Sequence, residues 1–197
     1  MDLKQTVGST DIYLIDQIMK IRYASGETIL DAGCGNGRNM YWFFHNDFDM
    51  WGVDRDQRSI EQVKELYPKL SRNFKIAELT KLPFRDDFFD HLICSAVLHF
   101  AKDKDQFLEM FAELVRVLKP GGSLFIRIAS DICAENNITH IENGIYKLGD
   151  GTDRFLLTKK LLQEVMEIHS LSFLEPLKTT NVNDLRSMST LMLQNSA

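Results

Sequence analysis

The chain has 197 residues, with 23 Lys and Arg against 28 Asp and Glu and a formal net charge of −5. This length favours a single domain with a sizeable core, and the composition excludes a disordered, collagen-like or low-complexity chain. No apolar run is long enough to cross a membrane and no block of Lys and Arg occurs, so we expect neither a membrane nor a nucleic acid as a partner. Cys34, Cys94 and Cys133 form no disulfide framework or metal motif, and residues 1–11 lack a signal pattern, so we expect a cytoplasmic protein without a metal.

Apolar periodicity predicts strands that alternate with helices along the chain. In chain order, strands are expected at residues 28–31, 50–54, 73–77, 90–94, 123–129, 172–177 and 188–194. Helices are expected over the first 25 residues and at 36–45, 59–67, 105–118 and 158–169. The first helix would have Ser9 or Thr10 as its cap, and Thr158 would cap the last helix. The apolar face expected for the first helix consists of Ile12, Ile15, Ile18, Met19 and Tyr23.

This alternation predicts an α/β fold, in which a doubly wound, mostly parallel, seven-stranded sheet lies between two layers of helices. The last two strands are joined by the loop 179–187, which is too short for a crossover, so they should form an antiparallel hairpin at the C-terminal edge. Residues 130–151 show no clear periodicity and exceed an ordinary connection in length. They are expected to be either a substrate lid or a floppy surface insertion.

A glycine-rich turn follows the first predicted strand, with Gly33, Gly35 and Gly37 at alternate positions after Asp31. Such glycines let the backbone pass close to a ligand at the mouth of the sheet. The NAD fingerprint needs a third glycine at the position of Arg38, and the phosphate-binding loop needs a Gly-Lys-Ser/Thr sequence, which is absent. The turn therefore differs from both nucleotide motifs.

Two acids narrow the choice of ligand. Asp31, beside the turn, would repel a pyrophosphate but favour a cation such as an ammonium or sulfonium group. Asp54 ends the next strand, 21 residues after Gly33, where a carboxylate of a doubly wound sheet can hold both hydroxyls of a ribose. Together they indicate a ligand with a positive amino-acid end and a nucleoside end.

These residues resemble motif I of the class I S-adenosylmethionine-dependent methyltransferases, an apolar run followed by D/E-x-G-x-G-x-G. Further segments are similar to motifs of that family in the same order, and the resemblance extends roughly over residues 26–194. These segments are residues 52–54, 77–84, 88–100 and 118–122. The chain is thus identified as a member of this family, of the small-molecule type, with a Rossmann-like fold and S-adenosylmethionine as its cofactor.

The resemblance implies a cofactor role for each residue that matches a motif. The residues expected around the methionine part are Asp31, Gly33, Cys34 and Gly35, with Asp54 on the ribose hydroxyls. The residues expected around the adenine are Arg55 over one face, Glu78 at the amino group and the backbone N–H of Leu79 at N1. The residues expected beside the methionine chain and the transferred methyl group are Ser95, Ala96 and Leu98.

Methyl transfer from a sulfonium depends mainly on alignment, because the electrophile is already activated, and a base is needed only if the acceptor must lose a proton. His99, just past the fourth strand, is the one candidate catalytic base. The Asn/Asp-Pro-Pro-Tyr motif of enzymes that methylate base or amide nitrogens is missing after Cys94. We therefore expect a small-molecule acceptor that is methylated on an O, N or S atom. The protein is expected to be a monomer or a homodimer.

On this basis the chain is divided into parts of a single methyltransferase domain. These are an N-terminal helical cap (1–25), a cofactor-binding core (26–129), a segment that contains the candidate substrate lid (130–157) and a closing helix with a strand pair (158–197). Besides the lid, the residues expected to recognise the acceptor are Tyr13, Arg22, Tyr23, Arg154 and Phe155. The alternative is a non-catalytic cofactor-binding or partner-binding protein, and an NAD oxidoreductase is a third interpretation, disfavoured by Arg38.

Overall fold

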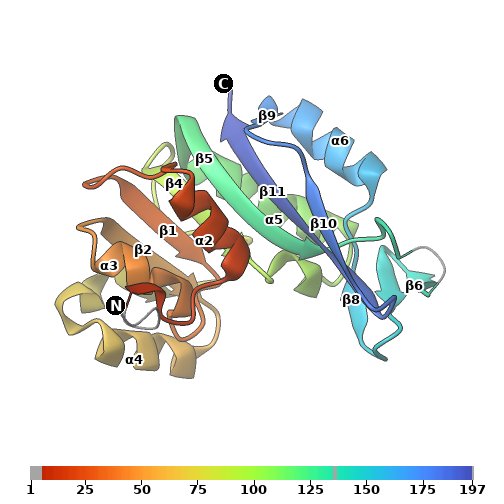
Figure 1. The fold of residues 1–197 in the computed structure, drawn as a ribbon, viewed down its shortest axis with the longest axis horizontal. Coiled ribbons are helices and arrows are strands. Elements are labelled where there is room, and N and C mark those ends of the chain that lie inside the picture. Colours follow the sequence, from red (N-terminus) through yellow and green to blue (C-terminus); the bar gives the residue numbers. More distant parts are fainter. Residues whose placement is uncertain (1–5, 135–136, 197) are drawn as a thin grey trace.

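The computed structural model describes residues 6–134 and 137–196. Its main sheet runs in the order β10-β11-β5-β4-β1-β2-β3, and β9 pairs with β11 beside this path (Figure 1). The strands of this sheet are β1 (Thr28–Ala32), β2 (Asp49–Asp54), β3 (Phe74–Ile76), β4 (Phe89–Ser95), β5 (Leu118–Ala129), β9 (Leu171–Phe173), β10 (Lys178–Val182) and β11 (Arg186–Asn195). The strands β1 to β5 pair with one another in parallel, and β11 is antiparallel to β5, β9 and β10. The doubly wound, mostly parallel α/β fold and its antiparallel ending are confirmed.

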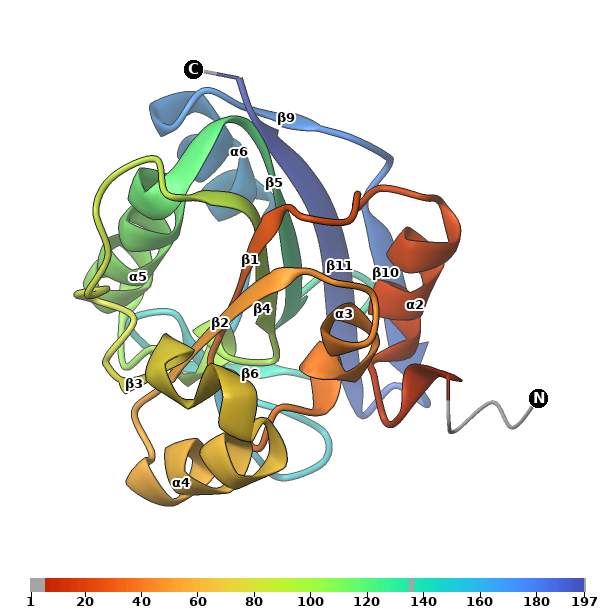
Figure 2. The same ribbon diagram turned by 90° about the vertical axis from the view of Figure 1, so that its left-hand side faces the viewer.

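Helices cover both faces of the sheet. The α-helices are α2 (Ile12–Met19), α3 (Tyr41–Phe44), α4 (Gln57–Leu66), α5 (Lys104–Val117) and α6 (Lys159–Ile168), and the 3₁₀ segments are Arg38–Met40, Pro68–Asn73 and Leu98–Phe100. In Figure 2, α5 and α6 lie on one side of the strands, and α2 and α3 lie on the other. Successive residues of β1 enter the two cores, because a strand alternates its side chains: Ile29 packs on the α2–α4 side and Leu30 on the α5–α6 side. Of the described helices, none has the length and apolar character to cross a bilayer.

The helix caps are mostly short side-chain acceptors. Thr158 accepts a hydrogen bond from the backbone N–H of Leu161 at 3.1 Å, as the sequence predicted for α6. The prediction for the first helix is wrong in two respects. Asp11, rather than Ser9 or Thr10, caps α2, and Ile12 and Met19 are exposed. The helix ends at Met19, so Tyr23 lies beyond it, and its buried residues are Leu14 and Gln17.

The C-terminal strands also start at other residues than expected. The edge strand β10 covers Lys178–Val182, within the segment predicted as a loop, and it pairs with β11. The apolar run at 172–177 contributes only Leu171–Phe173 as β9, since Pro176 has no N–H to donate to a ladder. An edge strand need not be apolar, and this one is rich in Thr and Asn.

The segment predicted as a substrate lid or a floppy insertion contains a second, three-stranded antiparallel sheet at residues 139–155. Its strands are β6 (Thr139–Glu142), β7 (Ile145–Lys147) and β8 (Asp153–Phe155). A separate apolar cluster of Ala129, Leu148, Leu156 and Met188 joins this sheet to the ends of β5 and β11. The small sheet is therefore fixed to the carboxyl end of β5, as the positions of β6 and β8 in Figure 1 indicate.

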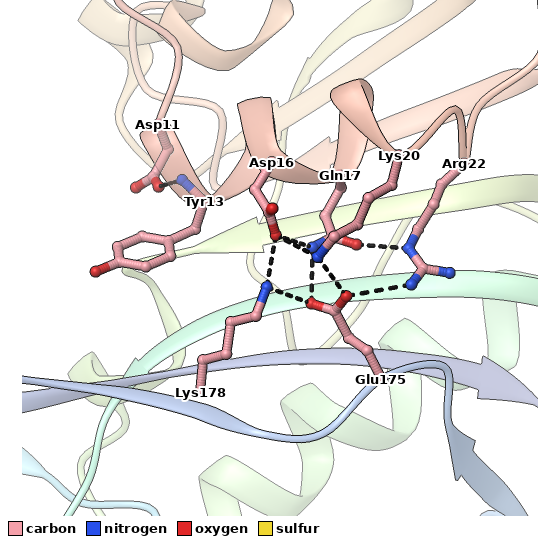
Figure 3. A network of polar contacts seen from close by, with 8 residues as sticks. All are labelled: Asp11, Tyr13, Asp16, Gln17, Lys20, Arg22, Glu175 and Lys178. Carbon is pink, nitrogen blue, oxygen red and sulfur yellow. Dashed lines mark hydrogen bonds and ion pairs between the residues drawn. The ribbon is translucent and has the colours of Figure 1, made fainter.

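A network of ion pairs fixes α2 to the segment before β10 (Figure 3). The Glu175 carboxylate accepts hydrogen bonds from Lys20 at 2.6 Å and Arg22 at 3.2 Å, and it pairs with Lys178 at 2.9 Å. Burial raises the pKa of Glu175, but the bonds from Lys178, Lys20, Gln17 and Arg22 outweigh it and lower the pKa to about 2. The network thus ties residues more than 150 positions apart in the chain.

Candidate functional site

A cavity of about 220 Å³ lies at the carboxyl ends of the parallel strands. It is placed where the strand order reverses, because the chain runs from β1 outward to β3 and then returns to β4 on the other side of β1. Such a switch point leaves a crevice between the loops that leave the two central strands. The residues that line the cavity are Gly33, Asp54, Arg55, Glu78, Leu79, Thr80, Ser95, Ala96, Val97, Phe100, Gln106 and Met110.

The turn after β1 passes very close to the loop after β4. Gly33 has φ +83°, and a Cβ at this position would lie 2.3 Å from a methyl group of Val97. The backbone N–H groups of Gly33 and Cys34 both donate to the Val53 carbonyl, at 2.8 and 2.9 Å. At Gly35 a Cβ would meet open space, so the chain leaves room there. The Val53 carbonyl thus fixes the start of the turn, and the space beside Gly35 is free of side chains.

Asp54 is fixed between this turn and the start of α4. Its Oδ2 accepts from the Gly35 N–H at 2.8 Å, and its Oδ1 accepts from the Asp56 N–H at 2.9 Å. Each carboxylate oxygen can accept further hydrogen bonds from a ligand. The carboxylate lines the cavity in a fixed orientation, which suits the two neighbouring hydroxyls of a ribose.

Asp31 lies beneath the turn and is only 3% exposed. Its Oδ2 is buried and has no hydrogen-bond partner among the described residues. Burial raises the pKa of Asp31 to about 7; the charge of Arg38 lowers it and that of Asp54 raises it. A buried carboxylate with an unused oxygen is a favourable neighbour for a cationic group.

The structure brings most of the predicted cofactor residues together. Gly33, Asp54, Arg55, Glu78, Leu79, Ser95 and Ala96 line the cavity. Cys34 and Gly35 belong to the turn beside it, and Asp31 lies at the end of β1. Burial raises the pKa of the Cys34 thiol, so this cysteine is inert. The prediction that Leu98 lies beside the methionine chain is wrong, because its side chain is 1% exposed and packs in the α5–α6 core.

Several cavity residues were missed by the sequence reading. They are Thr80, Val97, Phe100, Gln106 and Met110. Gln106 and Met110 stand four residues apart on α5, so they share one helix face. The four-residue spacing indicates that the two side chains lie on the same face of the helix. Only the fold shows that this face borders the cavity.

The candidate base His99 lies outside this cavity, in an adjoining one. It is 7% exposed, and its Nδ1 accepts from the Ala129 N–H at 3.4 Å. Burial lowers the pKa of His99 to about 4, and the charges of Arg154, Arg127 and Arg186 act in the same direction. His99 is therefore neutral near pH 7, with its proton on Nε2. This tautomer can donate a hydrogen bond but cannot take a proton at Nε2.

The residues suggested for acceptor recognition separate into two groups. Arg154 lines the adjoining cavity, and the Tyr13 ring faces the Arg127 guanidinium at 4.9 Å. Arg22 is instead bound to Glu175, and Tyr23 is 6% exposed in the core against Phe43. Phe155 is also buried, stacked on Phe107. The last three serve packing and the ion-pair network.

The fold and the cavity define a Rossmann-like domain with a site for a nucleoside that carries a cationic end, and comparisons agree with this class. A family model described as a methyltransferase domain matches residues 30–126. A tRNA (carboxymethyluridine(34)-5-O)-methyltransferase of Arabidopsis thaliana is 35% identical over 104 residues, which are 53% of this chain and 24% of that protein. Residues 30–126 thus form a methyltransferase domain, and the chain is similar to S-adenosylmethionine-dependent methyltransferases in its fold.

Solved structures share the fold over nearly the whole chain. An S-adenosylmethionine-dependent methyltransferase from Methanosarcina mazei has a TM-score of 0.74 at 19% identity, covering 90% of this chain and 96% of that chain. The 1,6-didemethyltoxoflavin-N1-methyltransferase of Burkholderia thailandensis, with bound 1,6-didemethyltoxoflavin and S-adenosylhomocysteine, has a TM-score of 0.69 at 15% identity, covering 100% and 82% of the two chains. These likenesses establish the fold. The match covers about a quarter of the length of the Arabidopsis relative.

The residues present fit S-adenosylmethionine, the cofactor of the family. The unused Oδ2 of Asp31 suits its cationic amino-acid end, and the open space at Gly35 admits its chain. Asp54 presents a fixed carboxylate to its ribose. Among the residues that the structure describes, no group of His, Cys, Asp and Glu is arranged to hold a metal ion.

Proposed function

We propose that the protein transfers a methyl group from S-adenosylmethionine to an O, N or S atom of a small-molecule acceptor. The observation that carries this proposal is the pairing of a buried Asp31, whose Oδ2 has no partner, with a fixed Asp54 on the two sides of one glycine turn. This pairing supports a cofactor that is cationic at one end and a nucleoside at the other. An NAD dinucleotide would bring its pyrophosphate towards the Asp31 carboxylate.

In this proposal the chain binds and aligns rather than exchanging protons. S-adenosylmethionine supplies an activated methyl group on a sulfonium sulfur, which leaves as a neutral thioether. Asp54 orients the nucleoside end, and Asp31 orients the amino-acid end. Ala96 lines both cavities, so the acceptor would approach the methyl group past this residue. Positioning of this kind supplies most of the rate enhancement when the electrophile needs no activation.

His99 has a positioning role in this proposal. Its Nδ1 is engaged by the Ala129 N–H, and a pKa of about 4 makes it a weak base at neutral pH. It can still donate from Nε2 to an acceptor oxygen or nitrogen. The proposal also assigns residues 26–129 to the cofactor, residues 130–157 to the acceptor, and the whole chain to one domain of a cytoplasmic enzyme.

The test is transfer of a radiolabelled methyl group into a cell extract, followed by separation of small molecules, protein and RNA. The proposal predicts label in a small-molecule product, and loss of that product with the Asp54→Ala variant. Binding of S-adenosylhomocysteine without label in any fraction would instead support the alternative, a non-catalytic cofactor-binding protein.

A tRNA acceptor is the second candidate, because the Arabidopsis relative is named as a tRNA methyltransferase. The chain's net charge of −5 gives it no general attraction to a polyanion. Ribonuclease-sensitive label in the same experiment would decide for this candidate and against a small molecule.

A further inference from the structure

The adjoining cavity, of about 230 Å³, lies between the ends of β5 and β11 and the small sheet β6–β8. Its charged residues among the described part of the chain are Arg127, Arg154, Arg186 and Asp150. The carboxylates that pair with these arginines are Asp150 and Asp11, so one of the three positive charges has no counter-charge of its own. Asp11 is moreover shared with Arg38, at 3.5 Å.

Arg127 is more enclosed than Arg186, since their side chains are 22% and 51% exposed. Its Nη1 donates to Asp11 Oδ2 at 3.0 Å, and its guanidinium lies over the Tyr13 ring. Its Nε is buried and has no hydrogen-bond partner among the described residues. Arg127 lines the cavity, and its guanidinium is only partly balanced, because Asp11 is shared with Arg38.

Arg154 and Arg186 reach the cavity from other elements. Arg154 has no ion pair among the described residues; it donates to the Asp153 carbonyl and stacks on Phe100 at 4.9 Å. Phe100 in turn lines the cofactor cavity, so Arg154 stands at the border of the two cavities. Arg186 is paired with Asp150 at 3.5 Å, a long contact to a carboxylate that already accepts from Thr152.

We propose that this cavity binds the carboxylate of the methyl acceptor, so that the substrate class is a small carboxylic acid. The inference rests on the proposed function for the role of the ligand, but the site itself stands on the cavity and on its three arginines, of which Arg154 has no ion pair among the described residues. A guanidinium matches a carboxylate through two parallel hydrogen bonds, and a single unbalanced positive charge suits a monoanion better than a phosphate dianion.

The neutral His99 fits the same ligand. Its charged form is disfavoured beside three arginines, so it adds an Nε2–H donor without adding charge. The cavity, of about 230 Å³, is smaller than the pockets of about 300–1,000 Å³ that hold drug-sized ligands, so it suits a small acid group.

The experiment follows the arginine Nε–H resonances by NMR during titration with benzoate, benzamide and inorganic phosphate, each with and without S-adenosylhomocysteine. Arg154→Gln/Arg186→Gln is the test variant. Arg58→Gln/Arg72→Gln, which removes two exposed arginines outside the cavity, is the control with the same change in net charge.

Saturable benzoate shifts at Arg127, Arg154 and Arg186, absent with benzamide and weakened at least about tenfold in the test variant alone, would support the inference. Equal responses of the two variants, or shifts with phosphate but not with benzoate, would overturn it. Failure of S-adenosylhomocysteine to bind, with benzoate binding intact, would count against the proposed function and leave the carboxylate site standing.

Discussion

The two cavities meet at Ala96 but carry opposite charge. The cofactor cavity has Asp54, Glu78 and one arginine, Arg55, in its wall and Asp31 beneath it, whereas the adjoining cavity has three arginines and one acid, Asp150. The acids come from short local motifs at the ends of parallel strands, but the arginines come from β5, β11 and the segment that contains β8. The difference shows how one sheet edge can separate a cationic ligand from an anionic one. Substitutions that change one of the two cavities at a time test this difference.

The largest effect is expected for Gly33→Ala. The new Cβ would lie 2.3 Å from a Val97 methyl group, at φ +83°. Strain and overpacking should together lower the free energy of unfolding by about 2–5 kcal/mol and abolish S-adenosylhomocysteine binding. Urea denaturation and calorimetry measure both. Gly121→Ala is the control, because Gly121 has φ +76° and nothing within 4 Å; it should cost only about 1–2 kcal/mol and leave binding intact. Equal affinity of the two variants for S-adenosylhomocysteine would contradict the claim that the turn at Gly33 has no room for a side chain.

Asp54→Ala should weaken S-adenosylhomocysteine binding by about 10- to 100-fold, because it removes a charged acceptor from the ribose hydroxyls. Calorimetric titration measures the change. Asp56→Ala removes a neighbouring exposed carboxylate that caps α4, and should lower the stability slightly with no loss of affinity. An affinity loss common to both variants would point to the start of α4 rather than to Asp54.

Asp31 provides a pH test of the acidic cavity. A pKa raised to about 7 means that the ligand-free chain is stabilised at low pH, and that this stabilisation is lost as pH rises through 7. The ammonium group of S-adenosylhomocysteine interacts favourably with the ionised form of Asp31, so affinity should rise about tenfold from pH 6 to pH 8, with release of a proton. In Asp31→Asn, binding should be weaker and nearly independent of pH. A slope preserved in this variant would assign the titration to another group.

The sequence predicted the cofactor side well, since its signals are local. A strand followed by Gly33 and Gly35, and Asp54 at the end of the next strand, are set by neighbours in the chain and by the parallel arrangement of β1 and β2. The arginine cavity could not be predicted in the same way. Arg127, Arg154 and Arg186 are far apart in sequence, and each alone resembles an ordinary surface arginine. They converge only because β11 pairs with β5 and the small sheet closes over both ends.

Two errors of the fold prediction have the same origin. The polar edge strand β10 was read as a loop, because its pairing with β11 depends on backbone bonds rather than on apolar side chains. The strands β6 to β8 are short and largely exposed, so they lack the alternation that marks a half-buried strand.

The smallest effect on the two cavities is expected for Glu175→Gln, which acts on the network that fixes α2. The variant should lose about 1–3 kcal/mol of stability at pH 7 and keep its affinity for S-adenosylhomocysteine. The lowered pKa of Glu175 means that this stabilisation is present above the ordinary pKa of 4.5 and is lost as pH falls towards 2. Glu164→Gln, which breaks a single exposed pair with Lys104, should change stability by less than about 1 kcal/mol. Thermal melts between pH 3 and pH 7 compare them, and equal behaviour of the two variants would contradict a cooperative network.

The most direct test of the central claim is calorimetric titration of the wild-type chain with S-adenosylhomocysteine and, separately, with NAD. The acidic cavity predicts that one S-adenosylhomocysteine binds per chain, that NAD does not bind, and that Asp54→Ala weakens the former. Binding of NAD without binding of S-adenosylhomocysteine would contradict the assignment of the cavity.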